Sequence, residues 1–561
     1  MKAPARLRIP RKLVLRLESC AVNPLPSKAG PACQPGNPAY PASSLPLPVI
    51  SDSDDTLWTR LFWRGLAAVF AFRLAFMLFF CQQADLLGDE AYYWDWGRQP
   101  DWGYFSKPPM IGWLMGITGW ITGNAEWGIR LAPLLLGTGT LAAVFSLARD
   151  LYGARAACLA ALLIVLTPGN AGLNLFFTID APLLLAWSLA MLALWRAAEE
   201  AKPAWWLVLA LALGFGVLSK QMMLVFPALA LVFSAVSKDN RPMLARPGFW
   251  LAALAGMAFI TPVLMWNARH EWVTLEHTRH HFDTESLGMG KWLGRTLEFP
   301  AVQALVYTPV TFATLIFAAW LSLKNWRALG SRELYLLVFS VLPLLGFLLL
   351  SLRQRINPNW PAVFYVPLFI LAAAWLEGRL PFPPRSAWKK WSLRVAGSVT
   401  ALLHLALLVI FLTDLKGHKK LVEMQGWHET GSQAGAFLDD IPNPRRAFVL
   451  VAGYRYDAAQ LAFHMPQQPR VYRWSKTADV ESQYEVWPGP EERLGDDALI
   501  FQPGKEAPAE LKAPLRACFE NAERLGRIET PLGGGHVRYF DVFLARNLLT
   551  WTRAGGMTSA P

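Results

Sequence analysis

Long apolar runs alternate with short polar segments over most of the chain. Between Leu57 and Leu412 the apolar runs are roughly 18–24 residues long, which is the length that crosses a hydrocarbon core about 30 Å thick. A soluble helix of this length would carry a polar face instead. The pattern therefore predicts eleven membrane-spanning helices with approximate bounds 57–82, 130–149, 154–172, 181–198, 204–219, 222–237, 247–268, 300–323, 333–352, 359–377 and 392–413.

Beyond the last predicted span the apolar runs become short. Residues 416–548 are therefore predicted to form a small α/β domain, followed by a tail over 549–561. Nothing in this domain looks catalytic by itself. Its helix-like stretch is Asp457–His464, and its strand-like runs are Ala447–Ala452, Ala498–Gln502 and Tyr539–Leu544.

The composition agrees with a membrane protein. Hydrophobic residues make up 54% of the chain and charged residues 17%, whereas soluble domains carry about 25% charged residues. A net charge of +12 is also typical of proteins that bind nucleic acid. However, no basic stripe with interleaved aromatic residues occurs in a soluble segment, so we expect no nucleic-acid partner.

The basic residues fall in alternate loops, which predicts the orientation in the membrane. A basic, Pro-rich N-terminal segment, residues 1–55, is predicted to be disordered and cytoplasmic. Eleven spans, of a possible 11–13, place loops 83–129 and 269–299 and the α/β domain on the outer side. The cytoplasmic loops carry Arg149, Arg155, Arg196, Lys202, Lys238, Arg241, Arg246, Lys324, Arg327, Arg332, Arg379, Arg385, Lys389 and Lys390.

The first outer loop combines carboxylates with many aromatic residues. Asp89 and Glu90 follow the outer end of the first span, where desolvation or a charged partner can tune a carboxylate for acid/base work. Lys107 precedes Pro108 and Pro109, which restrict the backbone of this segment. The aromatic residues alone also fit an interfacial helix resting on the bilayer.

Seven short motifs follow one another in order: Asp89-Glu-Ala-Tyr-Tyr, Gly103-Tyr-Phe-Ser-Lys-Pro-Pro, Arg130-Leu-Ala-Pro, Phe176-Phe-Thr-Ile-Asp-Ala-Pro, Leu218-Ser-Lys, Pro262-Val-Leu-Met-Trp-Asn-Ala-Arg-His and Asn359-Trp-Pro-Ala. This order resembles the protein O-mannosyltransferase/lipid A aminoarabinose transferase superfamily of C-type glycosyltransferases. The resemblance implies an inverting enzyme that moves a hexosyl or pentosyl group from a polyprenyl (undecaprenyl) phosphate to a lipid, glycan or protein acceptor.

The resemblance also implies roles for individual residues. Asp89 corresponds to the catalytic acidic residue, with Glu90 beside it, and Asp180 to a second acidic residue. Lys107 corresponds to the lysine that binds the donor phosphate, with Tyr104 next to the same group. From the sequence alone, Asp180 also fits an N-cap for the helix that begins near Pro182.

Four further cations are candidates for anion binding. Arg269 resembles a further donor-phosphate ligand of the family. Lys220 fits either a second phosphate ligand or a residue that snorkels to lipid headgroups. Arg353 and Arg355 fit either lipid headgroup contacts or surface salt bridges. Ser106 replaces an acidic residue that is common before the lysine in the aminoarabinose branch, which leaves the sugar and acceptor open.

The resulting hypothesis is an enzyme of a bacterial cytoplasmic membrane with its active site facing the periplasm. Its partners are the lipid-linked sugar donor, the acceptor and the membrane lipids. The five cysteines form no CxxC pair, and no metal ligand is assigned, although a divalent metal is left open near His280 and His281. A lipid flippase or transporter is the alternative, as is an inactive scaffold protein.

Overall fold

The computed structural model describes residues 52–200, 202–280, 289–384, 386–413, 422–477 and 479–551. Most of the predicted segment 1–55 and residues 552–561 of the predicted tail lie outside these ranges, as does His281. Helices between residues 52 and 269 are α1 (Asp52–Cys81), α2 (Gly88–Arg98), α3 (Met110–Thr122), α4 (Glu126–Tyr152), α5 (Ala154–Val165), α6 (Pro168–Leu175), α7 (Asp180–Glu200), α8 (Pro203–Ser219), α9 (Val225–Val236), α10 (Pro247–Ala258) and α11 (Ile260–Arg269). The later ones are α12 (Val273–His280), α13 (Met289–Tyr307), α14 (Pro309–Lys324), α15 (Ser331–Val338), α16 (Val341–Ser351), α17 (Ala362–Leu376), α18 (Ser386–Leu412), α20 (Trp427–Asp439), α21 (Arg455–His464), α22 (Gln483–Val486) and α23 (Ala513–Arg516).

The apolar helices account for the predicted spans, although several of these helices are short or bent. Within the described residues, six helices are long and apolar enough to cross a membrane, and the number rises to eight if each of two bent helix pairs is one span. Three other predicted spans, 204–219, 222–237 and 359–377, correspond to shorter apolar helices. The fold class, a polytopic helical membrane protein, is confirmed.

Two predicted spans are broken at proline residues. The predicted span 154–172 consists of α5 and α6, which meet at 73°, and the predicted span 300–323 bends by 112° between α13 and α14. Pro168 and Pro309 begin the second helix of each pair and lack the N–H group that would continue the first. Thr308 has a φ of 64°, which turns the chain sharply before α14. Each of these two predicted spans is therefore a bent pair of helices.

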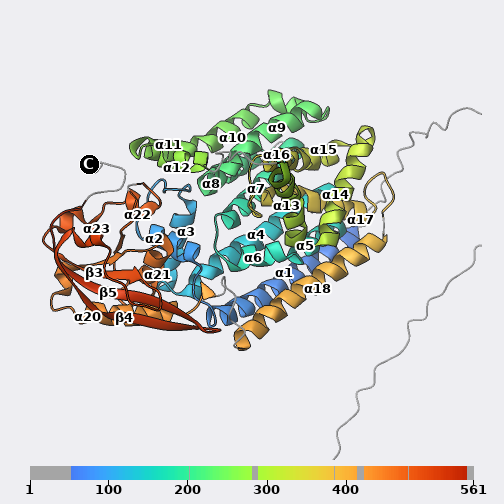
Figure 1. The fold of residues 1–561 in the computed structure, drawn as a ribbon. Coiled ribbons are helices and arrows are strands. Elements are labelled where there is room, and N and C mark those ends of the chain that lie inside the picture. Colours follow the sequence, from blue (N-terminus) through green and yellow to red (C-terminus); the bar gives the residue numbers. More distant parts are fainter. Residues whose placement is uncertain are drawn as a thin grey trace, which may run out of the picture. The chain divides into compact units, whose positions relative to one another are not determined.

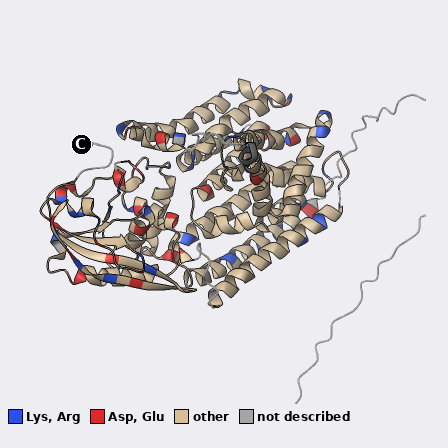
Figure 2. Cartoon of the chain, in the orientation of Figure 1, with Lys and Arg blue, Asp and Glu red and all other residues tan. Residues whose placement is uncertain are grey.

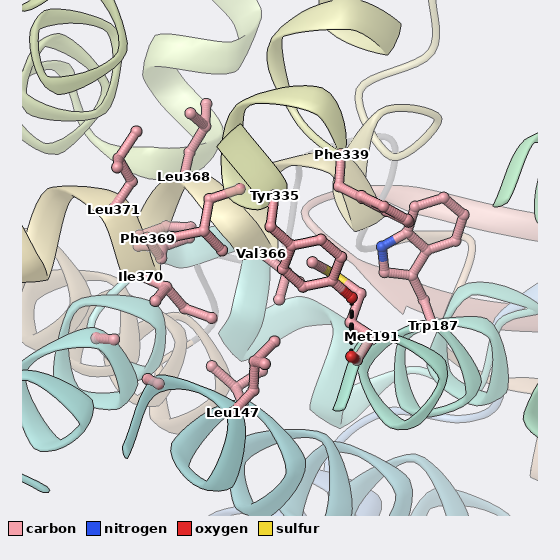
Figure 3. Packing of buried hydrophobic residues seen from close by; sticks show 14 of the residues in the cluster. Leu147, Trp187, Met191, Tyr335, Phe339, Val366, Leu368, Phe369, Ile370 and Leu371 are labelled. Atoms are coloured by element: carbon pink, nitrogen blue, oxygen red, sulfur yellow. Dashed lines mark hydrogen bonds between the residues drawn. The ribbon is translucent and has the colours of Figure 1, made fainter. Parts of the chain in front are cut away.

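The core of the helical part forms around α17 (Figure 3). Every side chain of α17 is buried, so its continuous apolar sequence faces protein on all sides. Tyr335 on α15 is also fully buried, and its hydroxyl donates a hydrogen bond of 2.8 Å to the carbonyl oxygen of Met191 on α7. This contact satisfies a polar group that would otherwise be costly to bury.

The C-terminal part contains a five-stranded mixed sheet (Figure 1). The strand order is β2-β1-β3-β5-β4; β1 pairs in parallel with β2 and β3, whereas β5 pairs antiparallel with β3 and β4. The three predicted strands are present as β1, β3 and β5, and the predicted helix is α21, whereas β2 and β4 were not predicted. The strands are β1 (Ala447–Val451), β2 (Val471–Arg473), β3 (Asp497–Pro503), β4 (Phe519–Gly533) and β5 (His536–Leu548).

Hydrogen bonds join the C-terminal domain to the first long loop. The Gln460 side chain donates a bond of 2.7 Å to the Leu86 carbonyl oxygen, and the Tyr484 hydroxyl donates a bond of 2.7 Å to Asp95. Charged residues are sparse along the apolar helices and frequent over this domain (Figure 2). The aromatic residues of α2 are buried, so α2 is not an interfacial helix exposed to the bilayer.

Candidate active site

A buried ion pair positions the start of α2. The Glu90 carboxylate accepts hydrogen bonds from the backbone N–H groups of Leu87 (3.0 Å) and Phe177 (2.9 Å). It also faces Arg130 at 3.4 Å, and both side chains are fully buried. The Arg130 guanidinium in turn donates to the carbonyl oxygens of Ala84 and Asp85. Glu90 thus faces the protein interior, and this geometry fits a positioning role for the residue that was predicted to be catalytic.

Asp89 points the other way, toward the C-terminal domain. Its carboxylate is exposed and accepts a hydrogen bond of 2.6 Å from the Tyr456 hydroxyl on α21. Burial, followed by the neighbouring Asp89 charge, raises the pKa of Tyr456, so this hydroxyl keeps its proton and donates it. A Cβ atom at Gly88 would lie 2.5 Å from the Tyr456 ring, which explains why only glycine fits before Asp89.

Lys107 lies in the turn between α2 and α3. The backbone N–H of Tyr104 donates to the Lys107 carbonyl oxygen at 3.1 Å, which closes the turn ahead of Pro108. Within the described part of the chain, the Lys107 ammonium makes no hydrogen bond or ion pair. Burial and then the Lys220 ammonium lower the pKa of Lys107, whereas Asp89 and Asp180 raise it. These four charged groups therefore lie close enough to act on one another.

Asp180 and Lys220 form an ion pair near Lys107. Asp180 begins α7 and is buried; its two oxygens accept hydrogen bonds from the Lys220 ammonium (2.8 Å) and the Asn359 amide (2.5 Å). Both oxygens are therefore engaged, and this geometry fits an orienting role of Asp180 toward Lys220. No side-chain N-cap bond from Asp180 is present among the described contacts of α7. Lys220, at the end of α8, thus faces the site.

Tyr104 is packed away from these charges. Its hydroxyl donates to the carbonyl oxygen of Trp96 at 3.1 Å and accepts from the Asp101 N–H at 3.2 Å. The ring is fully buried and stacks on Trp96, with centroids 4.5 Å apart. The predicted phosphate-binding role of Tyr104 stays a prediction that this geometry does not support; the residue shapes the turn that carries Lys107.

No described contact joins the three arginines predicted to bind anions to this cluster. Arg269, in the last turn of α11, and Arg353, after α16, are exposed and make no ion pair among the described residues. Arg355 pairs with Glu298 at 2.6 Å, as its salt-bridge alternative predicted. Their proposed contacts with phosphate or lipid headgroups stay predictions.

An apolar cavity of about 330 Å³ lies next to the charged residues. Leu87 and Thr178 form part of its wall, and each is two residues away from one of the two aspartates. Asn359, which binds Asp180, also lines it, together with Tyr307 and Phe369. The site therefore combines a polar end with an apolar chamber, an arrangement suited to an amphiphilic ligand.

Sequence reasoning missed the contribution of the C-terminal domain. Tyr456 contacts Asp89 directly, and the neighbouring Arg455 guanidinium lies 5.7 Å from the centre of the Tyr92 ring. Arg455 also acts electrostatically on Lys107. The run Tyr454-Arg-Tyr456, an aromatic and basic cluster in an otherwise bland domain, was the available signal.

Comparisons with known sequences identify related proteins. Residues 106–266 match the dolichyl-phosphate-mannose-protein mannosyltransferase family. The chain is 30% identical over 316 residues to the lipid A galacturonosyltransferase RgtD of Rhizobium johnstonii, a match that covers 56% of this chain and 65% of that protein. It is 26% identical over 353 residues to the undecaprenyl phosphate-alpha-4-amino-4-deoxy-L-arabinose arabinosyl transferase of Edwardsiella ictaluri, over 58% of this chain and 59% of that protein. The chain thus spans about three fifths of the length of these curated relatives.

The fold is also similar to that of a solved structure. The crystal structure of ArnT from Cupriavidus metallidurans bound to undecaprenyl phosphate matches with a TM-score of 0.59 at 15% sequence identity. The match covers 87% of this chain and 98% of that chain. The apo structure of the same protein gives a TM-score of 0.57. At this identity the likeness shows a shared fold, including both the helical part and the C-terminal domain.

Proposed function

Because this chain belongs to the C-type glycosyltransferase superfamily, we propose that it transfers a sugar from undecaprenyl phosphate to a lipid acceptor at the outer face of a bacterial cytoplasmic membrane. The names of its relatives support both the donor and a lipid A-type acceptor. The observation that carries the proposal is that two lysines and two aspartates lie close together beside one apolar cavity.

In this proposal the two ammonium groups hold the donor phosphate. Among the residues that the structure describes, Lys107 has no anionic partner in direct contact, and its charge is disfavoured by burial and by Lys220. A phosphate placed between the two lysines removes this repulsion and satisfies both groups. The adjoining apolar cavity has room for part of an isoprenoid or acyl chain.

The reaction is a single in-line displacement at the anomeric carbon. The acceptor oxygen forms the new bond to this carbon while the bond to the donor phosphate oxygen breaks, leaving undecaprenyl phosphate with an additional charge. At about 4 Å and an effective dielectric constant near 20, one ammonium stabilises this charge by about 4 kcal/mol, before the cost of desolvating the lysine. Lys107 supplies the positive charge that stabilises the leaving phosphate, and Asp180 holds Lys220 in place.

Asp89 accepts the proton when the acceptor is a hydroxyl group. Its exposed carboxylate, oriented by the Tyr456 hydroxyl, is the one acidic group of the cluster with an oxygen not engaged by another described side chain. An acceptor that is already anionic, such as a phosphate, needs no base. Asp89 then supports the positive charge that develops on the sugar ring.

The test uses the full chain in liposomes that contain undecaprenyl-phosphate sugars and lipid A. Mass spectrometry follows the release of free undecaprenyl phosphate and the gain in mass of the acceptor. We expect both to occur together in the wild type, and both to be lost in Lys107→Ala. Movement of intact donor across the bilayer without release of undecaprenyl phosphate would replace the proposal with a flippase.

A further inference from the structure

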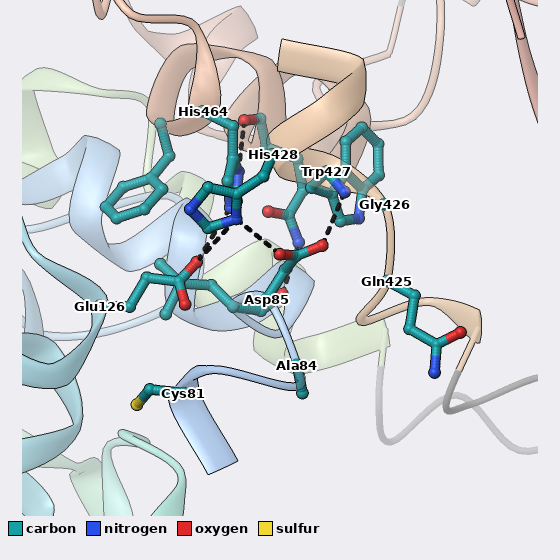
Figure 4. A network of polar contacts seen from close by, with 12 residues as sticks. Cys81, Ala84, Asp85, Glu126, Gln425, Gly426, Trp427, His428 and His464 are labelled. Carbon is teal, nitrogen blue, oxygen red and sulfur yellow. Dashed lines mark hydrogen bonds and ion pairs between the residues drawn. The ribbon is translucent and has the colours of Figure 1, made fainter. Parts of the chain in front are cut away.

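Four potential metal ligands meet where the C-terminal domain contacts the helical part (Figure 4). Asp85 lies in the connection between α1 and α2, and Glu126 begins α4. His428 and His464 belong to α20 and α21 of the C-terminal domain. One ligand atom of each side chain lies within 4.8 Å of all the others.

The hydrogen bonding of His464 shows that its contact with Glu126 needs a metal cation or a further proton between the two side chains. Its Nδ1 lies 3.0 Å from the Gln460 carbonyl oxygen, which can only accept, so Nδ1 carries the hydrogen. In the neutral ring Nε2 then presents a lone pair, yet it faces a Glu126 oxygen at 3.1 Å. Both side chains are almost fully buried here. A metal ion between the two atoms converts a repulsive contact into two coordinate bonds.

The other two side chains complete the same site. Nδ1 of His428 lies 2.7 Å from one Asp85 oxygen and 3.8 Å from Glu126. The second Asp85 oxygen accepts a hydrogen bond of 2.6 Å from the Trp427 N–H, which fixes the carboxylate orientation. Metal ligands are commonly held by such outer hydrogen bonds, and the His464–Gln460 bond is another.

We propose that Asp85, Glu126, His428 and His464 bind one zinc ion. Two imidazoles and two carboxylates form a ligand set that zinc accepts, in the tetrahedral geometry of sites closed by protein ligands. Ligand atoms about 2.0–2.2 Å from a tetrahedral ion lie about 3.4 Å apart. Three of the six ligand-atom pairs, at 2.7, 3.1 and 3.8 Å, bracket this value. All six lie within 4.8 Å, so the widest pair must close by up to about 1.4 Å when the ion binds.

The ion fastens the C-terminal domain to the loop that carries Asp89. Asp85 is four residues before Asp89, and its carbonyl oxygen is also held by Arg130 at 2.7 Å. His464 ends the same helix that presents Tyr456 to Asp89. The zinc ion is thus structural; it aligns two elements of the active site without contacting the reacting atoms. His428, whose side chain is 69% exposed, leaves a path for the ion to enter.

Zinc content of the purified full-length chain tests the proposal. The protein is stripped with a chelator, reloaded with zinc chloride, separated from free ion and analysed by mass spectrometry of the metal. We expect one zinc ion per chain in the wild type and in the control His536→Gln, whose side chain is exposed at the start of β5. His428→Gln should weaken zinc binding at least tenfold. Equal zinc binding by the wild type and His428→Gln, or no bound zinc in the wild type, overturns the site.

Two further measurements separate a lost site from a misfolded variant. Glu126→Gln keeps the size of the side chain and removes its charge, and it should also lose zinc while its secondary structure, measured by circular dichroism, is retained. Zinc should raise the Tm of the wild type and of His536→Gln but not that of His428→Gln. X-ray absorption at the zinc edge should show only nitrogen and oxygen neighbours; sulfur neighbours contradict the assignment.

Discussion

Asp89 and Glu90 are adjacent in the chain but lie in different surroundings. Glu90 is held by a buried arginine and two backbone N–H groups, whereas Asp89 is exposed and contacts a single tyrosine hydroxyl. Because successive residues at the start of a helix point in different directions, one carboxylate anchors α2 and its neighbour faces the site. The sequence predicted both as catalytic, since spacing alone does not reveal which way each residue points.

The Tyr456 hydroxyl orients Asp89, so its removal should lower the rate. A hydrogen bond to a charged group contributes about 1.5–3 kcal/mol, and Tyr456→Phe should therefore reduce kcat by about 10- to 100-fold with a hydroxyl acceptor. Tyr454→Phe, in the same segment and exposed, is the matched control. A steady-state transfer assay that finds equal kcat for Tyr456→Phe and wild type would remove this role.

Deprotonation of Lys107 should produce the alkaline limb in the pH profile of kcat/KM for the donor. An ordinary lysine titrates at about pH 10.4, but burial and then Lys220 lower the pKa of Lys107. Its ammonium is present below this lowered pKa and is lost as the pH rises through it. The value of kcat/KM for the donor should therefore fall at a pH below that of an ordinary lysine.

The same profile measured on Lys107→Arg provides the control. Arginine stays charged throughout this range, so the residual activity of the variant should persist to higher pH. An alkaline limb that is identical in Lys107→Arg and in the wild type would assign the titration to another group.

At the scale of elements, α2 depends on the buried pair of Glu90 and Arg130. Breaking such a pair by removing one partner costs about 3–5 kcal/mol, because the other charge stays buried. Arg130→Ala should therefore lower the Tm of the detergent-solubilised chain, whereas Arg353→Ala, at an exposed position, should not. Glu90→Gln should cost less, since its amide oxygen still accepts from Leu87 or Phe177. An unchanged Tm in Arg130→Ala would contradict this account of α2.

The helices also show where sequence patterns reach their limit. The period and length of apolar runs predicted nearly every apolar helix, because burial in lipid demands a continuous hydrophobic segment. The same pattern cannot show that Pro168 and Pro309 divide two of these runs, since proline is tolerated in straight membrane helices when neighbours satisfy the freed carbonyl groups. The strands β2 and β4 were missed because one is short and the other is largely polar.

At the scale of the whole helical part, two of the basic residues predicted to be cytoplasmic pair with acidic residues at the ends of other helices. Arg149 pairs with Asp55 at the start of α1, and Arg155 pairs with Glu377 after α17. The loop carrying Asp89, the start of α12 and the C-terminal domain meet at the site instead, through contacts such as that of the Thr274 hydroxyl with the Tyr104 carbonyl oxygen (2.9 Å). The sequence predicted that these three segments share one side, but not that the C-terminal domain reaches Asp89.

Cysteine labelling tests the proposed orientation. In a background with the five native cysteines replaced by alanine, a membrane-impermeant reagent is applied to spheroplasts. We expect Trp102→Cys and Asp479→Cys to be labelled, and Arg327→Cys to be labelled only after the membrane is opened. Labelling of Arg327→Cys alone in intact spheroplasts would reverse the orientation.

The central claim is that Asp89 acts in glycosyl transfer from a lipid-linked donor. Single-turnover transfer to a hydroxyl acceptor should be measured for Asp89→Asn and wild type, together with donor binding to each. A general base contributes about 10²–10⁴-fold, so the variant should lose at least about a hundredfold in rate while donor affinity and Tm stay close to those of the wild type. Transfer by Asp89→Asn at the wild-type rate would contradict the account.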